Sequence, residues 1–408
     1  MIDGAAAPPV TLTEGADHTF YTGSKVDGEL VVRNSAILRV PAGNSTSILD
    51  LILTGQPDSG SIVGAGASNL EITRTFNWDS GEVQSVLVKI ASGATMKAFH
   101  SIPDSTRKLL GSTLTVRGKA EVTADLSVIS GSRIVVDGSD FVGEFAVNEA
   151  SITSDPSFPG LPMWVREGGT LKFNGGRVLN PDTGDPWFSV EVPVVLDLGE
   201  VSSRDYQFDK GYLQRGGKTT FSGVTVVSGH APTNEGPGNN IRQEAIYVTA
   251  GSLVLTPNLR TQLYTDFDIA IKSSAPLDAG GTIQVGANKN GIINVEGVFT
   301  VAGDDTGDVS IQANLYLSGT TRVTVKNMAS DYILISGILT ISGELDVVEF
   351  PNAVIPDQRW TVFSAGNDLP AGVPKIIGDF DSVSNGYSYT KSPGSPPSKF
   401  INVIKGAS

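Results

Sequence analysis

The segment 202–218 carries the residues that come closest to a catalytic set. Acidic and basic groups alternate there around two tyrosines: Arg204, Asp205, Tyr206, Asp209, Lys210, Tyr212, Arg215 and Lys218. A polysaccharide lyase needs a base that takes a proton beside a carboxylate, and Lys, Arg or Ca²⁺ to hold the developing enolate charge. A glycosidase needs two carboxyl groups about 5 to 9 Å apart, which Asp205 and Asp209 would supply.

The same segment also has the composition of an ordinary solvated loop. The chain has 29 Lys and Arg against 43 Asp and Glu, a formal charge of −14, and an acidic protein repels a polyuronate at long range. We therefore name no catalytic residue. Lys210 and Arg215, with Tyr206 and Tyr212 as stacking rings, are binding candidates.

Two of the four tryptophans, Trp164 and Trp187, lie in stretches rich in Pro and Gly. Aromatic side chains cover a large area at a small cost in entropy, so these two join the binding candidates, for sugar or for a protein partner. Trp78 and Trp360 lie in repeat-like strands, which favours core packing or cap plugging.

Acidic turns are the candidate ion sites, and Asp304, Asp305 and Asp308 form the strongest set. Ca²⁺ takes six to eight oxygen ligands at roughly 2.3–2.6 Å, which a tight Asp/Gly turn can supply. The turn matches neither an EF-hand loop nor a Gly-Gly-x-Gly-x-Asp repeat. Because Asp and Gly are also ordinary turn residues, the sequence predicts no obligatory cofactor, with Ca²⁺ as the one candidate ion.

Composition argues against several other classes. Cysteine is absent and the three histidines, His18, His100 and His230, are isolated, which disfavours zinc sites and thiolate catalysis. The acidic balance disfavours nucleic acid, and no apolar run approaches the roughly 18 residues of a membrane-spanning helix. The first residues lack the basic region and apolar core of a signal peptide, so an exported protein would be present here in a processed form.

These groups must be positioned by β-structure. Gly (47) and Pro (22) are abundant, and short alternating segments are broken by Gly-Ser, Asp-Gly or Asn-Gly, with no sustained helical period. Apolar pairs two residues apart recur through Gly111–Asp140, and Gly111-Ser112 returns as Gly131-Ser132 after 20 residues. This spacing matches one coil of a solenoid.

We therefore predict an all-β fold, a right-handed parallel β-helix with coils of roughly 20 to 25 residues that share one continuous core. A β-sandwich or jelly roll is the rival, but its strands are usually longer and separated by hairpin signals. The predicted core columns contain Leu114, Val116, Ile134, Val136, Ile283, Val285, Ile293, Val301, Leu317, Val323, Ile333 and Leu345.

Several stretches interrupt the repeat. We expect residues 1–351 to form the solenoid, with an N-terminal cap and loop excursions at 154–187 and 202–242 that build the binding face. Strand pairing should be interrupted by Pro351, Pro356, Pro370 and Pro374, so residues 352–408 are expected to form a C-terminal capping segment.

The segment Leu70–Asp140, with Phe76-Asn77-Trp78 followed by a Gly turn, and the closing ILISGILTISGELDVVEF segment resemble bacterial secreted and cell-surface β-helix repeat proteins of the autotransporter-passenger type. The resemblance covers about half of the chain. It implies a right-handed parallel β-helix, an extracellular or surface setting, and adhesive, scaffolding or matrix roles.

Together these observations favour a non-enzymatic extracellular solenoid, a structural or adhesive module of a cell surface or matrix. Its expected partners are a cell-surface component, a polysaccharide or other copies of itself, with no nucleic acid and no transmembrane segment. Catalysis stays open. The alternatives are a polysaccharide lyase or glycosidase on the same solenoid, and a phage or viral fibre module.

Overall fold

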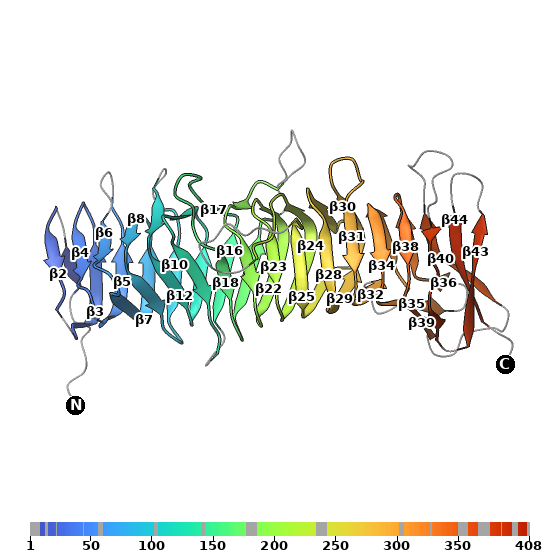
Figure 1. The fold of residues 1–408 in the computed structure, drawn as a ribbon. Helices are drawn as coiled ribbons and strands as arrows, with labels where there is room; N and C mark the ends of the chain where they lie inside the picture. The colour runs from blue at the N-terminus through green and yellow to red at the C-terminus, as the bar shows by residue number, and fades with distance from the viewer. Residues whose placement is uncertain are drawn as a thin grey trace, which may run out of the picture. The chain divides into compact units, whose positions relative to one another are not determined.

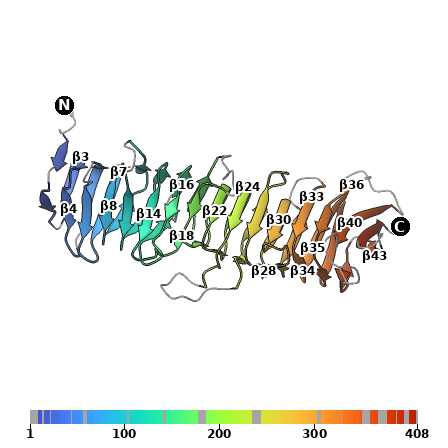
Figure 2. The same cartoon turned by 90° about the horizontal axis from the view of Figure 1, so that it is seen from above.

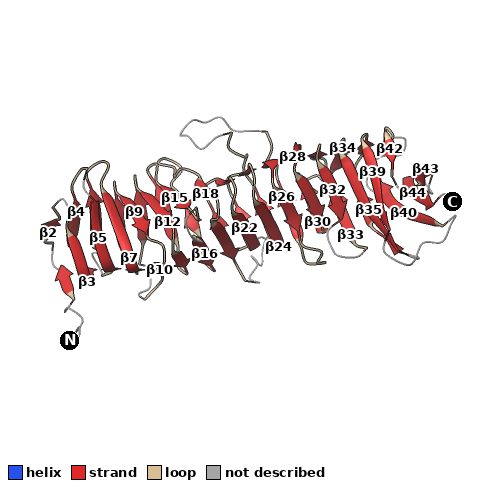
Figure 3. Cartoon of the chain, turned by 90° about the horizontal axis from the view of Figure 1, so that it is seen from below, coloured by secondary structure: helices blue, strands red, loops and turns tan. Residues whose placement is uncertain are grey.

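The fold is built from strands alone. The computed structural model describes residues 9–12, 15–21, 23–43, 45–55, 60–101, 105–139, 143–176, 186–233, 243–301, 306–326, 329–349, 358–365, 376–384, 386–393 and 399–405. Every regular element in these ranges is a β-strand (Figure 3). Accordingly, the described residues include no helix long and apolar enough to cross a membrane.

The chain divides into two compact units, each described by itself below. The first comprises Met1–Asn180, Trp187–Val201 and Asn234–Asn239, and the second comprises Pro181–Pro186, Ser202–Thr233 and Asn240–Ser408. The predicted boundary at residue 351 stays a prediction.

In the first unit, successive coils add strands to three parallel ladders. The successive strands lie side by side from blue to green in Figures 1 and 2. Three long strands bend at a corner and serve two ladders: β3 (Lys25–Val32), β5 (Ser45–Leu53) and β7 (Asn69–Trp78). Ladder A contains β1 (Val10–Leu12), the second halves of these strands, β10 (Thr95–Ala98), β13 (Lys119–Val122), β16 (Glu144–Asn148) and β19 (Thr170–Asn174).

The other two ladders of this unit are equally regular. Ladder B contains β2 (Asp17–Thr19), β4 (Ile37–Val40), β6 (Ser61–Gly64), β8 (Gly81–Gln84), β11 (Arg107–Leu110), β14 (Leu126–Ile129), β17 (Ile152–Thr153) and β20 (Ser189–Val190). Ladder C contains the first halves of the long strands, β9 (Leu87–Ile90), β12 (Thr113–Val116), β15 (Arg133–Val136), β18 (Met163–Val165) and β21 (Val194–Leu196).

The second unit has the same construction. One ladder contains β23 (Tyr212–Gln214), β25 (Ile246–Ala250), β28 (Ile269–Ser274), β31 (Ile292–Val295), β34 (Asn314–Leu317), β38 (Leu339–Ile341) and β41 (Ile376–Ile377). The next contains the first half of β24 (Lys218–Val227), β26 (Ser252–Leu255), β29 (Pro276–Ala279), β32 (Val298–Val301), β35 (Thr320–Lys326), β39 (Glu344–Glu349) and β42 (Ser382–Val383). The third contains the second half of β24, β27 (Gln262–Thr265), β30 (Gly281–Val285), β33 (Asp308–Gln312), β37 (Tyr332–Ile335) and β40 (Arg359–Ala365).

The parallel ladders confirm the predicted β-helix and exclude the sandwich. Thr95, Lys119, Glu144 and Thr170 align in ladder A, so a coil there takes 24 to 26 residues. All twelve residues of the predicted core columns are buried. They occupy inward positions, which alternate with polar outward residues in strands such as TLTV of β12 and TTRVTVK of β35.

The 20-residue recurrence of Gly-Ser reflects a stacked pair of buried serines. The Ser112 backbone N–H donates to Ser132 Oγ at 3.1 Å, and Ser132 Oγ donates to the Leu109 carbonyl at 2.7 Å. Because each hydroxyl bonds the backbone of a neighbouring coil, the repeated serine satisfies polar groups at a buried corner.

The prediction of loop excursions at 154–187 and 202–242 is largely wrong, because much of both segments forms strands. Residues 202–227 form β22 (Glu200–Phe208), β23 and β24, and Met163–Val165 and Thr170–Asn174 are strands β18 and β19. Inward positions of β22 are taken by Val201, Ser203, Tyr206 and Phe208. The charged residues between and after them made this alternation difficult to recognise in the sequence. Residues 177–185 and 234–242 lie outside the described residues.

The end of the chain keeps one more coil before it leaves the parallel pattern. Strands β40, β41 and β42 still pair in parallel with β37, β38 and β39. Strand β44 (Lys399–Lys405) then runs antiparallel to β40, and β43 (Tyr387–Pro393) runs antiparallel to β44. A further antiparallel pair joins β35 and β36 (Ala329–Ser330).

Candidate functional site

The two candidate tyrosines are inside the second unit. Tyr206 and Tyr212 are 0% exposed, and the Tyr212 ring packs edge-on against Phe208 and Phe221. The Tyr212 hydroxyl lies 2.6 Å from Thr219 Oγ1, and burial raises its pKa well above the ordinary value. Because both side chains are buried in the core, they offer no ring face to a sugar.

The charged residues of the same segment do not converge on one point. Lys210 is exposed before β23, and Arg215 is half-buried after it. Asp205 Oδ1 accepts the Val224 N–H at 2.9 Å, and Asp209 Oδ1 accepts the Gln207 amide N–H at 2.6 Å. The carboxyl groups proposed for a glycosidase pair thus support local structure.

For the calcium candidate, Asp304 and Asp305 lie outside the described residues. Asp308 is exposed at the start of β33. The buried carboxyl of Asp331 accepts the backbone N–H of Gly307 at 2.9 Å and of Thr324 at 2.6 Å. Within the described ranges no three His, Asp or Glu side chains gather closely enough to hold a metal.

Asp331 gives a pH-dependent prediction. Burial, with a smaller contribution from Asp308, raises its pKa from 3.8 to about 6 against the two N–H donors. A raised acid pKa means that the folded state binds the proton more tightly, so this stability is present below about pH 4 and is lost as the pH rises through 6. The loss is about 2–3 kcal/mol.

Asp331→Asn should therefore remove most of the decline in unfolding free energy between pH 4 and 6.5, measured by urea denaturation at several pH values. Asp308→Asn, at an exposed position, is the control and should leave most of the decline in place. A decline of equal size in Asp331→Asn would contradict the assignment.

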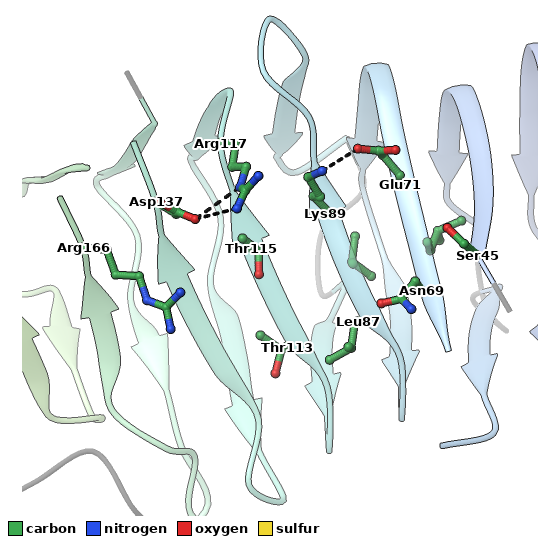
Figure 4. Close-up of a pocket in the computed structure, with 12 residues that line it drawn as sticks. Ser45, Asn69, Glu71, Leu87, Lys89, Thr113, Thr115, Arg117, Asp137 and Arg166 are labelled. Atoms are coloured by element: carbon green, nitrogen blue, oxygen red, sulfur yellow. Dashed lines mark hydrogen bonds and ion pairs between the residues drawn. The ribbon is translucent and has the colours of Figure 1, made fainter. Parts of the chain in front are cut away.

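The described surface of the first unit has a groove of about 440 Å³ on the outward face of ladder C (Figure 4). Parallel register places its side chains in rows that cross the coils. One row contains Ser45, Asn69, Leu87, Thr113 and Arg133, and the next contains Glu71, Lys89, Thr115, Val135 and Trp164. A polar floor with one exposed leucine, Leu87, thus runs across successive coils.

Ion pairs hold the charged side chains of this groove between coils. Lys89 Nζ lies 2.7 Å from Glu71 Oε1, and Arg117 Nη2 lies 3.0 Å from Asp137 Oδ2 (Figure 4). Burial alone would raise the pKa of Asp137, but hydrogen bonds from Ser139 and Arg117 outweigh it and leave the pKa below its ordinary value. Asp137 is therefore a weak base.

At one end of the groove, Trp164 lies close to two arginines. The Arg166 guanidinium carbon is 3.9 Å from the ring centroid and that of Arg133 is 5.6 Å from it. The indole N–H donates to the Asp197 carboxylate. Of the residues named from the sequence, Trp164 is the one that adjoins this groove, and Trp187 is 56% exposed elsewhere on the first unit.

The other groove residues were not predicted from the sequence. Neighbours in a row are separated by 18 to 29 positions, from Asn69 and Leu87 to Val135 and Trp164. The outward residues of alternating strands were the available signal, but only the length of each coil brings them together.

Comparisons with known proteins add a structural likeness. No family model matches the chain, and no curated protein matches it. The chain is similar to the solved structure of a TibA fragment, residues 55–350, hyper-glycosylated through catalysis by TibC, at 14% identity and a TM-score of 0.32, over 77% of this chain and 90% of that one.

Proposed function

We propose that the chain is a non-enzymatic module of an extracellular or cell-surface setting, and that the groove on ladder C attaches it to a polysaccharide. The observation that carries this proposal is the pair of outward rows, which present hydroxyl, amide and charged groups at fixed positions. Adjacent coils lie about 4.8 Å apart, close to the length of one pyranose ring, so a linear glycan laid across the coils meets a new set of side chains at each sugar.

The groove is already ordered before anything binds. The strands beneath it are hydrogen-bonded on both sides, and the Lys89–Glu71 and Arg117–Asp137 pairs join neighbouring coils. A preorganised surface loses less side-chain entropy on binding. Binding therefore requires little rearrangement of the protein.

The same order argues against turnover. A general base works best when its pKa lies near the operating pH, whereas Asp137 has a lowered pKa and a buried carboxylate held by Arg117. Glu71 is paired with Lys89. These carboxylates are therefore better suited to binding than to acid–base chemistry. The lyase or glycosidase and the fibre module are the alternatives.

Retention on immobilised polysaccharides tests this function. We expect Leu87→Asp to weaken retention about tenfold or more, because a charge replaces the apolar contact, which is 45% exposed, in the groove. Leu259→Asp, at a position 94% exposed in the second unit, is the matched control and should retain full binding.

The same incubations should produce no new reducing ends and no absorbance of unsaturated uronates. Depolymerisation abolished by Lys210→Ala or Arg215→Ala would favour the lyase. Equal retention of Leu87→Asp and the unaltered chain would remove the groove from the proposal.

Trp187 gives a separate prediction. Its side chain is 56% exposed, so Trp187→Ala should change the unfolding free energy by less than about 0.5 kcal/mol but reduce attachment if this ring is a second contact. Attachment is measured on the polysaccharides that retain the unaltered chain. Unchanged attachment would leave the groove as the sole proposed contact.

A further inference from the structure

Arg166 is the charged group in the groove that the protein leaves without a counter-charge. Five charged side chains line the groove, and four of them form the pairs Glu71–Lys89 and Arg117–Asp137. Within the described part of the chain, the guanidinium of Arg166 has no ion pair, and its Nε is buried without a hydrogen-bond partner. In Figure 4 the group points along the ladder toward Thr113 and Thr115.

The neighbouring carboxylate is not available to Arg166. Arg117 donates to Asp137 Oδ2 from both Nε and Nη2, at 3.2 and 3.0 Å, and the Ser139 N–H donates to Oδ1. Among the described residues, the Arg166 guanidinium packs on the face of Trp164, with its carbon 3.9 Å from the ring centroid. Stacking on an aromatic ring restrains a planar guanidinium while it leaves the N–H edge able to donate.

Trp164 is itself restrained by further contacts. Its indole N–H donates to Asp197, and Arg133 lies 5.6 Å from its ring. The ring therefore holds Arg166 in place beside the groove. A partly desolvated cation without a partner is costly, and an anion that pairs with its fork of donors offsets that cost.

We propose that the groove binds an acidic polysaccharide, with a carboxylate or sulfate group of the glycan paired to the Arg166 guanidinium. The inference rests on the proposed function and specifies its ligand class. Thr113, Thr115 and Asn69 supply hydroxyl and amide partners for the sugar hydroxyl groups. From β5 to Arg166 the groove crosses six strands, a span of about 24 Å that accommodates about five pyranose rings.

The acidic protein as a whole does not prevent this binding. The formal charge of −14 is spread over 408 residues, and at physiological ionic strength charges are screened beyond about 8 Å. The anion would lie in direct contact with Arg166, where the local charge decides. Binding should therefore weaken with added salt.

Two matched pairs of polymers test the ligand class. They are dextran sulfate against dextran, and polygalacturonate against its methyl ester, each titrated into the full chain. We expect the anionic member of at least one pair to bind about tenfold or more tightly than its neutral member, and the two pairs distinguish sulfate from carboxylate.

The variant Arg166→Gln should remove that preference, Arg166→Lys should restore part of it, and Arg322→Gln, at an exposed ion pair of the second unit, should change nothing. Arg166→Lys keeps the test decisive if Arg166→Gln fails to fold. Equal binding of both polymers of each pair, or an unchanged preference in Arg166→Gln, would overturn this inference while the proposed function stands. Retention of no polysaccharide would overturn both.

Discussion

Replacing Arg107 by methionine is expected to lower the free energy of unfolding of the first unit by about 3–5 kcal/mol, because several buried carbonyl groups would lose their hydrogen-bond donor at about 1–3 kcal/mol each. Arg107 is 1% exposed and occupies an inward position of β11. Burial lowers the pKa of its guanidinium, while Asp79 and Asp125 act in the opposite direction.

Arg107 satisfies carbonyl groups from several coils at once. Its Nε donates to the Asp125 carbonyl at 3.1 Å, Nη1 to the Phe99 carbonyl at 2.9 Å and Nη2 to the Ser105 carbonyl at 2.8 Å. It also donates to the Asp79 carbonyl. Methionine fills a similar volume but donates no hydrogen bond, so these buried acceptors would lose their partner.

Amide hydrogen exchange is the suitable measurement, because a repeat fold can open in parts. Protection should fall in β8, β11 and β14, around the lost contacts. Arg39→Met is the matched control, because Arg39 pairs with Asp17 at an exposed site and such pairs contribute about 1 kcal/mol or less. Equal protection in the two variants would show that the Arg107 network does not stabilise the coil.

Val136→Asp is expected to destabilise the first unit by several kcal/mol, roughly 3 or more, because it places an unpaired carboxylate in the core. Val136 is 0% exposed and lies between Val116 and Val165 in ladder C. Thr123→Asp, at an exposed position after β13, should change stability by less than about 0.5 kcal/mol. Thermal unfolding compares the two, and an unchanged midpoint in Val136→Asp would contradict its place in the core.

The core was predictable because burial follows a local rule. Inward and outward residues alternate along a strand, so Leu114 and Val116, or Ile293 and Val295, identify their own environment without knowledge of any other coil. The rule failed at 202–218 because outward charges there are dense. The polar residues Arg204 and Gln207 there obscured the inward positions of Tyr206 and Phe208.

The groove was not predictable in the same way. Lys89 and Glu71, or Trp164 and Val135, become neighbours only through the register of separate strands. Register depends on the length of every intervening turn, and the composition of a turn does not fix its length. Trp164 could be named from its residue type, whereas the significance of Arg166 depends on which neighbours already pair with each other.

The unequal coil lengths have a consequence for changes in the length of the gene. Corners absorb the variation, since Thr113 aligns with Arg133 after 20 residues and Gly281 aligns with Val309 after 28. Codons added or removed at a corner leave the flanking strands in register. A single codon lost within a strand reverses the inward and outward side chains of the rest of that strand. Insertions and deletions should therefore be tolerated at corners and harmful within strands, whatever the chemical nature of the residues involved.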